Sequence, residues 1–124
     1  MSQRGLLLLA HGARNPQWAQ PFEKVALALR ARHPDALVRL AYLEFLSPTL
    51  PEAAAELCAA GARQIELLPM FLGSSGHVQR EVPVLIEQAE RELGCQIHVN
   101  PALGEQERVL QAMVDSAAAL IAAP

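Results

Sequence analysis

The segment Leu67–Pro83, LLPMFLGSSGHVQREVP, joins an apolar strand to a helix through a turn rich in glycine and serine. Because proline has no N–H to donate to a sheet, we expect the strand to end at Pro69. Ser75 is placed to cap the following helix, which puts His77 in its first turn. There the positive end of the helix dipole favours a neutral imidazole, the form that binds a metal ion or accepts a proton.

Apolar runs elsewhere in the chain predict a parallel sheet. The first, GLLLLA at 5–10, is continuous rather than alternating, which is typical of a strand buried on both faces. Further strands are expected at 36–43, 64–68 and 96–99. Strands that alternate with helices predict an α/β fold with right-handed crossovers, a strand order of 2-1-3-4 and helices on both faces of the sheet.

Four helices are expected between and after these strands, at about 15–33, 49–61, 75–94 and 105–122. Thr49 and Glu52 have the spacing of a capping box, and Gly94 is suited to end the third helix. Trp18 and Val25 fall on the predicted inward face of the first helix. The last helix has the clearest apolar stripe in the sequence, so we expect it to pack as well.

Composition limits the possible functions. The chain has 124 residues, enough for one domain over 1–124, with 52% hydrophobic and 4% aromatic residues. A net charge of -3 without a cluster of Lys or Arg argues against nucleic-acid and anionic-membrane partners. Cys58 and Cys95 lack metal-type spacing and indicate two buried thiols in a reducing cytosol. The run at 5–10 is too short to span a membrane and no signal peptide is evident, so we expect a cytoplasmic protein.

Three polar residues follow three neighbouring strands. His11 comes after the first strand, Glu44 after the second and His77 after the third. The predicted order places all three at the carboxyl edge, where the connections leave in opposite directions and ligands bind. Two imidazoles and a carboxylate suit a first-row divalent metal, although a histidine at a strand end is also commonly a hydrogen-bonded loop residue. His33 and His98 have no partner at ligand spacing and are interpreted as ordinary polar residues.

The loop after the third strand offers two readings. Met70, Phe71 and Leu72 either form a wall for a flat ligand or are core residues of a folded-back loop. Ser74 and Ser75 belong to a GSSG turn that resembles an anion cradle but lacks the lysine of a P-loop and the GxGxxG pattern.

Two arginines stand three residues from the candidate histidines. Arg14 and Arg80 are either solvated surface charges or contacts for a ligand carboxylate.

LLLLAHGARNP, followed by LEFLSPTLPEAAAELCAAGARQIELLPMFLGSSGHVQREVP, resembles the short single-domain form of the CbiX-type sirohydrochlorin chelatases, which are ATP-independent class II enzymes. The resemblance extends over nearly the whole chain and implies a chelatase-like, flavodoxin-like sheet. It also implies that His11, Glu44 and His77 handle the metal. This chain departs from the family pattern at Ala13, where family members often have Ser, and at Glu81, where Asp is usual. The absence of the serine hydroxyl at position 13 is expected to affect the efficiency and the metal preference of the reaction.

The resemblance implies insertion of Co²⁺ into sirohydrochlorin for cobalamin biosynthesis, without ATP, whereas relatives insert Fe²⁺ or Ni²⁺. Longer members contain two such domains around one cleft, so a short chain is expected to form a homodimer. The proposed tetrapyrrole wall consists of Met70, Phe71, Leu72, Ser74 and Ser75. Two alternatives remain open: a non-catalytic module that binds metal or tetrapyrrole, and a small nucleotide-binding domain.

Overall fold

The computed structural model describes residues 3–73 and 75–122 and contains a four-stranded parallel sheet. Across the sheet the strands lie in the order β2-β1-β3-β4, which confirms the predicted topology. Their bounds are β1 (Gln3–Ala10), β2 (Leu37–Tyr42), β3 (Ala62–Pro69) and β4 (Gln96–Val99). In β1, Leu8 is in register with Leu40 on one side and with Leu68 on the other. The leucine run therefore forms the second strand from one edge, paired on both sides and covered on both faces.

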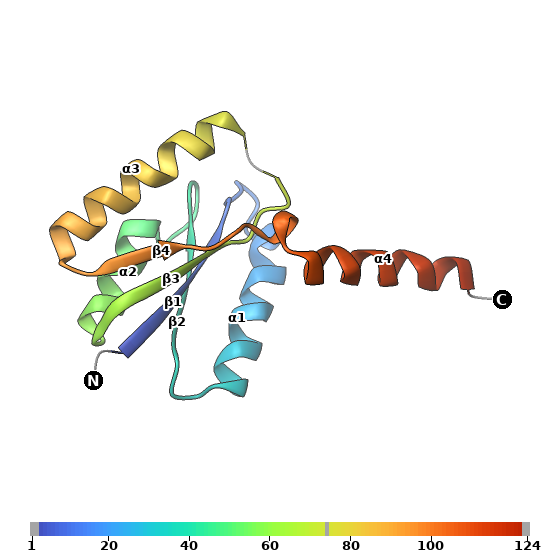
Figure 1. Cartoon of the computed structure of the whole chain (residues 1–124), viewed down its shortest axis with the longest axis horizontal. Helices are drawn as coiled ribbons and strands as arrows, with labels where there is room; N and C mark the ends of the chain where they lie inside the picture. The colour runs from blue at the N-terminus through green and yellow to red at the C-terminus, as the bar shows by residue number, and fades with distance from the viewer. Residues whose placement is uncertain (1–2, 74, 123–124) are drawn as a thin grey trace.

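Helices cover the two faces of the sheet unequally (Figure 1). A short 3₁₀-helix, η1 (Pro16–Ala19), leads into α1 (Gln20–Arg32), which lies on one face. The other face carries α2 (Leu50–Ala59) and α3 (Gly76–Leu93). No helix in the described part of the chain combines the length and the apolar character needed to cross a bilayer.

Side chains of the central strand alternate between two hydrophobic clusters. Leu7 and Leu9 belong to the cluster under α2 and α3, whereas Leu8 and Ala10 belong to the cluster under α1. The three leucines are completely buried. Truncation of one of them to Ala should cost about 2–5 kcal/mol of folding stability.

Three predicted helix caps are confirmed, at Thr49, Ser75 and Gly94. The Thr49 side chain accepts from the backbone N–H of Glu52, and the Glu52 carboxylate accepts from the N–H of Thr49 at 2.8 Å. These hydrogen bonds lower the pKa of Glu52. Ser75 caps α3 by accepting from the N–H of Val78 at 3.3 Å. Gly94 ends that helix with a φ of 71°, in the left-handed region that favours glycine.

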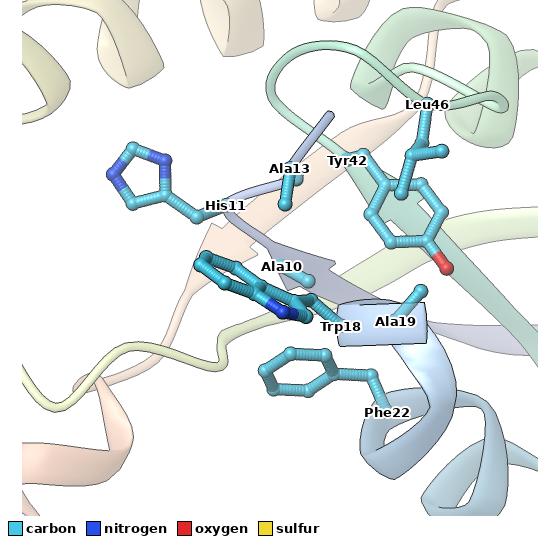
Figure 2. A pocket seen from close by; sticks show the side chains of 9 residues that line it. Ala10, His11, Ala13, Trp18, Ala19, Phe22, Tyr42 and Leu46 are labelled. Atoms are coloured by element: carbon cyan, nitrogen blue, oxygen red, sulfur yellow. The ribbon is translucent and has the colours of Figure 1, made fainter. Parts of the chain in front are cut away.

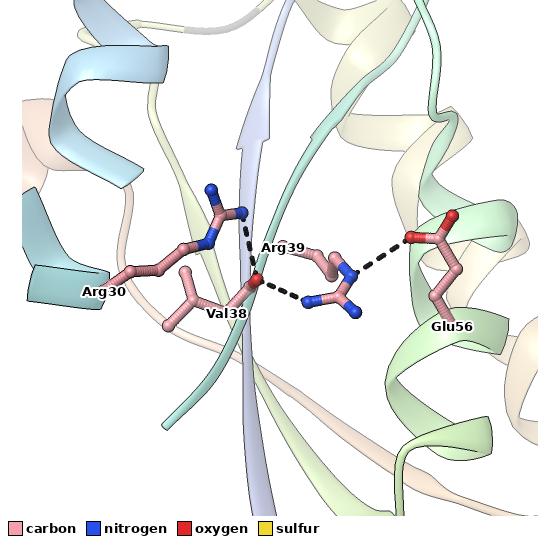
Figure 3. A network of polar contacts seen from close by, with 4 residues as sticks. All are labelled: Arg30, Val38, Arg39 and Glu56. Carbon is pink, nitrogen blue, oxygen red and sulfur yellow. Dashed lines mark hydrogen bonds and ion pairs between the residues drawn. The ribbon is translucent and has the colours of Figure 1, made fainter. Parts of the chain in front are cut away.

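Edge strand β2 is tied to the helices on both faces by a small polar network (Figure 3). Arg30 of α1 and Arg39 of β2 both donate to the carbonyl oxygen of Val38, at 3.1 and 3.0 Å. Arg39 also donates from Nε to Glu56 of α2 at 3.2 Å. The network satisfies polar groups at an edge that would otherwise be open to solvent.

The last helix differs from the prediction. After the 3₁₀-turn η2 (Leu103–Glu105), α4 (Glu107–Ala122) projects away from the sheet and has no buried residue (Figure 1). Its apolar stripe is exposed, with Leu120 at 81% and Ile121 at 88%. The expectation that this helix packs within its own subunit is wrong, because periodicity identifies an apolar face but not what covers it.

Two residues of the first helical segment also differ from the prediction. Trp18 lies in η1 and is 69% exposed, and Val25 of α1 is 42% exposed. Residue spacing therefore predicts a wider buried face for this helix than the face that α1 buries in the structure. The 3₁₀-turn changes the direction of Trp18 relative to the residues of α1.

The two cysteines are free, and no disulfide joins them. Cys95 is buried as expected, whereas Cys58 is half-buried. Burial, together with a hydrogen bond to the Cys58 side chain, raises the pKa of Cys95 to about 12. Cys95 is therefore a protonated, unreactive thiol at neutral pH.

Candidate functional site

His11 and Glu44 lie side by side at the carboxyl edge of the sheet. The parallel pairing of β1 and β2 continues past both strands, since the N–H of Leu43 donates to Ala10 at 3.1 Å and the N–H of Glu44 donates to His11 at 3.2 Å. This pairing brings the Nδ1 atom of His11 to 3.9 Å from the Oε1 atom of Glu44. Both side chains are about half exposed, so both are accessible to a ligand.

Gly12 permits this approach of the two loops. Its φ of 94° is in the left-handed region, and a Cβ at this position would overlap the carbonyl oxygen of Glu44. A side chain here would both strain the backbone and push the two loops apart. Glycine at position 12 is therefore needed for His11 and Glu44 to lie this close together.

A pocket of about 160 Å³ opens beside His11 (Figure 2). Its lining is mostly apolar and includes Phe22, Tyr42 and the exposed indole of Trp18. Burial raises the pKa of Tyr42, and the negative charge of Glu23 raises it further. The phenol is therefore neutral at physiological pH.

The loop after β3 places its three apolar residues differently. Phe71 is 6% exposed, and its ring centroid lies 5.5 Å from that of His11 at a tilt of 49°. Met70 is buried in the cluster under α1, whereas Leu72 is 63% exposed. Burial of Met70 and Phe71 favours the reading of these two as core residues, and it leaves Leu72 as the exposed side chain of the three. Ser74 lies outside the described residues, and Ser75 serves as the cap of α3.

His77 lies in the first turn of α3, as predicted, but its side chain interacts along its own helix. Its Nε2 atom is 2.8 Å from Oε2 of Glu81, and the histidine side chain is 76% exposed. Among residues 3–73 and 75–122, no three His, Cys, Asp or Glu side chains are close enough to hold one ion. The structure therefore brings together His11 with Glu44 and His77 with Glu81, as two separate pairs.

The His11–Glu44 pair has nearly the spacing that two ligands of one ion need. Two donor atoms about 2.1 Å from a metal are separated by about 3.0–3.4 Å at octahedral to tetrahedral angles. The observed 3.9 Å exceeds this by a distance that a small side-chain rotation covers. The two atoms lie beyond hydrogen-bonding distance, so a bound cation would replace no existing hydrogen bond between them.

Sequence reasoning missed two aromatic residues near this pair. Residue spacing places Trp18 on a helix face, and no periodic pattern in the sequence singles out Phe45, which is 56% exposed. Each is close in sequence to a candidate residue, since Phe45 directly follows Glu44 and Trp18 follows His11 by seven positions. For Phe45, the available signal is an aromatic residue directly after the candidate residue that follows a strand.

Comparison with known proteins identifies relatives over most of the chain. A profile of the family described as CbiX matches residues 5–120. A protein of Saccharolobus solfataricus named sirohydrochlorin cobaltochelatase is 33% identical over 117 residues, which cover 89% of this chain and 90% of the relative.

Solved structures show the same fold. A CbiX protein from Marinobacter aquaeolei VT8 superposes with a TM-score of 0.84 at 28% identity, with coverage of 95% of this chain and 97% of the other. The sirohydrochlorin chelatase SirB from Bacillus subtilis subspecies spizizenii, solved in complex with cobalt, gives a TM-score of 0.73 at 23% identity. This chain is covered to 91% in that comparison but spans only 49% of the SirB chain.

Proposed function

Because the chain belongs to the CbiX family, we propose that it inserts a divalent metal ion, Co²⁺ in the first place, into sirohydrochlorin without ATP. The observation that carries the proposal is the accessible His11–Glu44 pair at the carboxyl edge of the sheet, beside an aromatic-lined pocket. The relatives named for this reaction with cobalt support Co²⁺ as the metal. Fe²⁺ and Ni²⁺ are the other candidates.

Each polar residue has a separate role in the proposed reaction. His11 binds the incoming ion as a neutral imidazole, and Glu44 balances its charge. Two pyrrole N–H protons must leave the ring as a divalent ion enters; the Glu44 carboxylate accepts one of them, and solvent water takes up the other. His77, whose exposed side chain would have to leave its contact with Glu81, completes the ligand set when the macrocycle is bound.

The macrocycle is proposed to lie across the edge formed by Trp18, Leu72 and the His11–Glu44 pair. Trp18 and Leu72 are large apolar side chains that are 69% and 63% exposed, and flat apolar rings bury such surface favourably. Binding of the ring would exclude water from the metal-transfer step.

Metal insertion is tested with purified sirohydrochlorin and Co²⁺, Fe²⁺ or Ni²⁺, followed by the absorbance change of the ring. We expect His11→Ala and Glu44→Gln to slow insertion by about 100-fold or more, in the range of acid–base and ligand deletions. His33→Ala is the matched control, since His33 is an exposed histidine at the far end of α1. Folded His11→Ala and His77→Ala variants with wild-type rates would refute the assigned roles.

A non-catalytic carrier is the second candidate function. Exposure of the metal pair and the small size of the pocket would also suit a protein that binds metal or tetrapyrrole without turnover. Substrate in large excess distinguishes the two. A chelatase metallates many rings per protein, whereas a carrier stops after one equivalent.

The active form is proposed to be a homodimer in which a second copy covers α4. Apolar side chains of α4 are exposed along one stripe, which is typical of a helix that packs against a partner. A second copy is the proposed partner because one chain corresponds to about half of the SirB chain. Two copies would then supply the two walls of one cleft.

Light scattering with Ile121→Lys tests the homodimer. We expect wild type to have the mass of a dimer and the variant to have the mass of a monomer, because a buried lysine charge opposes association. Gln111→Lys on the same helix is the control, since it adds the same charge beside Glu107, with which Gln111 already interacts. A wild-type monomer that is fully active at micromolar concentration would refute the homodimer.

A further inference from the structure

An arginine and an aromatic ring from two different loops meet beside the His11–Glu44 pair. The Cζ atom of Arg14 lies 4.9 Å from the ring centroid of Phe45. Arg14 follows His11 by three residues, and Phe45 directly follows Glu44. The contact therefore joins the β1–η1 loop, which carries His11, to the β2–α2 loop, which carries Glu44.

Phe45 occupies this position against a local backbone preference. Its φ is 68°, and no other non-glycine residue within the described ranges has a positive φ. The N–H of Leu46 donates to the carbonyl of Glu44 at 2.9 Å, so Phe45 is the centre of a γ-turn of the rarer, strained form. A bulky residue persists in such a conformation only where the surrounding structure holds it, and such residues cluster at ligand sites.

Arg14 differs from Arg30, Arg39 and Arg91 in what holds its guanidinium. Arg39 and Arg91 form ion pairs with glutamates, and Arg30 donates to a backbone carbonyl. Within residues 3–73 and 75–122, Arg14 has no carboxylate partner, and its contact is with an aromatic face. An aromatic face attracts a guanidinium without neutralising its charge, so the N–H groups of Arg14 remain able to bind a planar anion.

We propose that Arg14, oriented by Phe45, binds a carboxylate on the rim of the tetrapyrrole and makes the site selective for carboxylated rings. The inference rests on the proposed function, because sirohydrochlorin carries acetate and propionate groups around its ring. A carboxylate on Arg14 sets the macrocycle at a fixed distance from the His11–Glu44 pair. Phe45 is a positioning residue in this arrangement, since it acts on the ligand through Arg14.

Binding is measured without metal, by quenching of the single tryptophan, Trp18, in the lining of the pocket. The probes are sirohydrochlorin and a porphyrin with four cationic N-methylpyridyl groups, a ring of similar size without carboxylates. Arg14→Gln should weaken sirohydrochlorin binding by about tenfold, as expected for loss of one charge-assisted hydrogen-bonded pair, and should not weaken binding of the cationic ring. Arg14→Lys should restore part of the affinity, because it keeps the charge but not the planar fork.

Two further variants separate this role from a structural one. Phe45→Gly should keep the fold, since glycine accepts the positive φ, but should weaken sirohydrochlorin binding by about threefold through loss of the stacking contact. Arg32→Gln at the far end of α1 removes the same charge and should have no effect.

The outcomes of this experiment are distinct. Selective loss of sirohydrochlorin affinity in Arg14→Gln, with affinity unchanged in Arg32→Gln, would support the inference. Equal affinity of the two variants for sirohydrochlorin, or equal losses for the anionic and cationic rings, would overturn it while the proposed function stands. Failure of the wild-type protein to bind any tetrapyrrole would overturn the inference and the proposed function together.

Discussion

Replacement of Gly12 by alanine should separate the two loops that form the candidate site. The change adds two penalties that the structure resolves. The positive φ of 94° costs an alanine about 1 kcal/mol. Overlap of the new Cβ with the backbone carbonyl of Glu44 adds about 2 kcal/mol, as is typical of overpacking against a rigid neighbour. We therefore expect Gly12→Ala to lower the free energy of unfolding by about 3 kcal/mol.

Other glycines of the chain isolate the two penalties. Gly94 has a φ of 71° and open space around it, so Gly94→Ala should show the backbone penalty alone, about 1 kcal/mol. Gly104 has no positive φ, but its Cβ would overlap the carbonyl of Leu72, so Gly104→Ala should show overpacking alone, about 2 kcal/mol. Gly73→Ala meets neither obstacle and is the control.

Urea unfolding of the four variants measures these differences. With a slope of about 1.5 kcal/mol/M, a loss of 3 kcal/mol shifts the midpoint by about 2 M. A chain of ordinary stability, about 5–15 kcal/mol, remains folded after such a loss, so metal insertion can be assayed on the same sample. A midpoint for Gly12→Ala equal to that of Gly73→Ala would refute the claim that the two loops are in contact through this glycine.

Two further results are expected. Thr49→Ala should lower the free energy of unfolding by about 1 kcal/mol through loss of the helix cap, as measured by urea unfolding. The backbone N–H and then the side chain of Thr49 lower the pKa of Glu52 by hydrogen bonding, so the stability that Glu52 gives relative to Glu52→Gln should be present above the ordinary pKa of 4.5 and lost as pH falls through the lowered value. In native protein, a disulfide reagent at neutral pH should modify half-buried Cys58 and leave Cys95 unmodified, because burial raises the pKa of Cys95 to about 12. Mass spectrometry locates the modified residue, and rapid modification of Cys95 would contradict this expectation.

The topology of the sheet was predictable because it depends on patterns that are local in sequence. Continuous apolar runs identify buried parallel strands, and Pro69 and Gly94 end elements for reasons of covalent geometry. The order 2-1-3-4 is the natural one for four strands that alternate with helices, and right-handed crossovers then place helices on both faces of the sheet. Strand and helix bounds differed from the predictions by a few residues, which is the usual uncertainty at element ends.

Side-chain directions at the site were less predictable. Topology correctly placed His11 and His77 at one edge of the sheet, but it did not reveal that His77 is 2.8 Å from Glu81 of its own helix. The first turn of a helix directs side chains along the helix, so a residue four positions later competes with a distant partner. From the sequence alone, Glu81 is only a departure from the family pattern, in which Asp is usual.

The place of β1 in the sheet has a consequence for how the chain folds. β1 is synthesised before β2 and β3, the two strands that it pairs with. Its run Leu6–Leu9 therefore stays unpaired until Leu37 and then Ala62 and the residues after each have left the ribosome. Non-local pairing of this kind slows folding and leaves an aggregation-prone segment exposed in the meantime. A nascent chain from which β1 but not Leu37 has emerged should consequently depend on chaperones more than one from which Pro69 has also emerged.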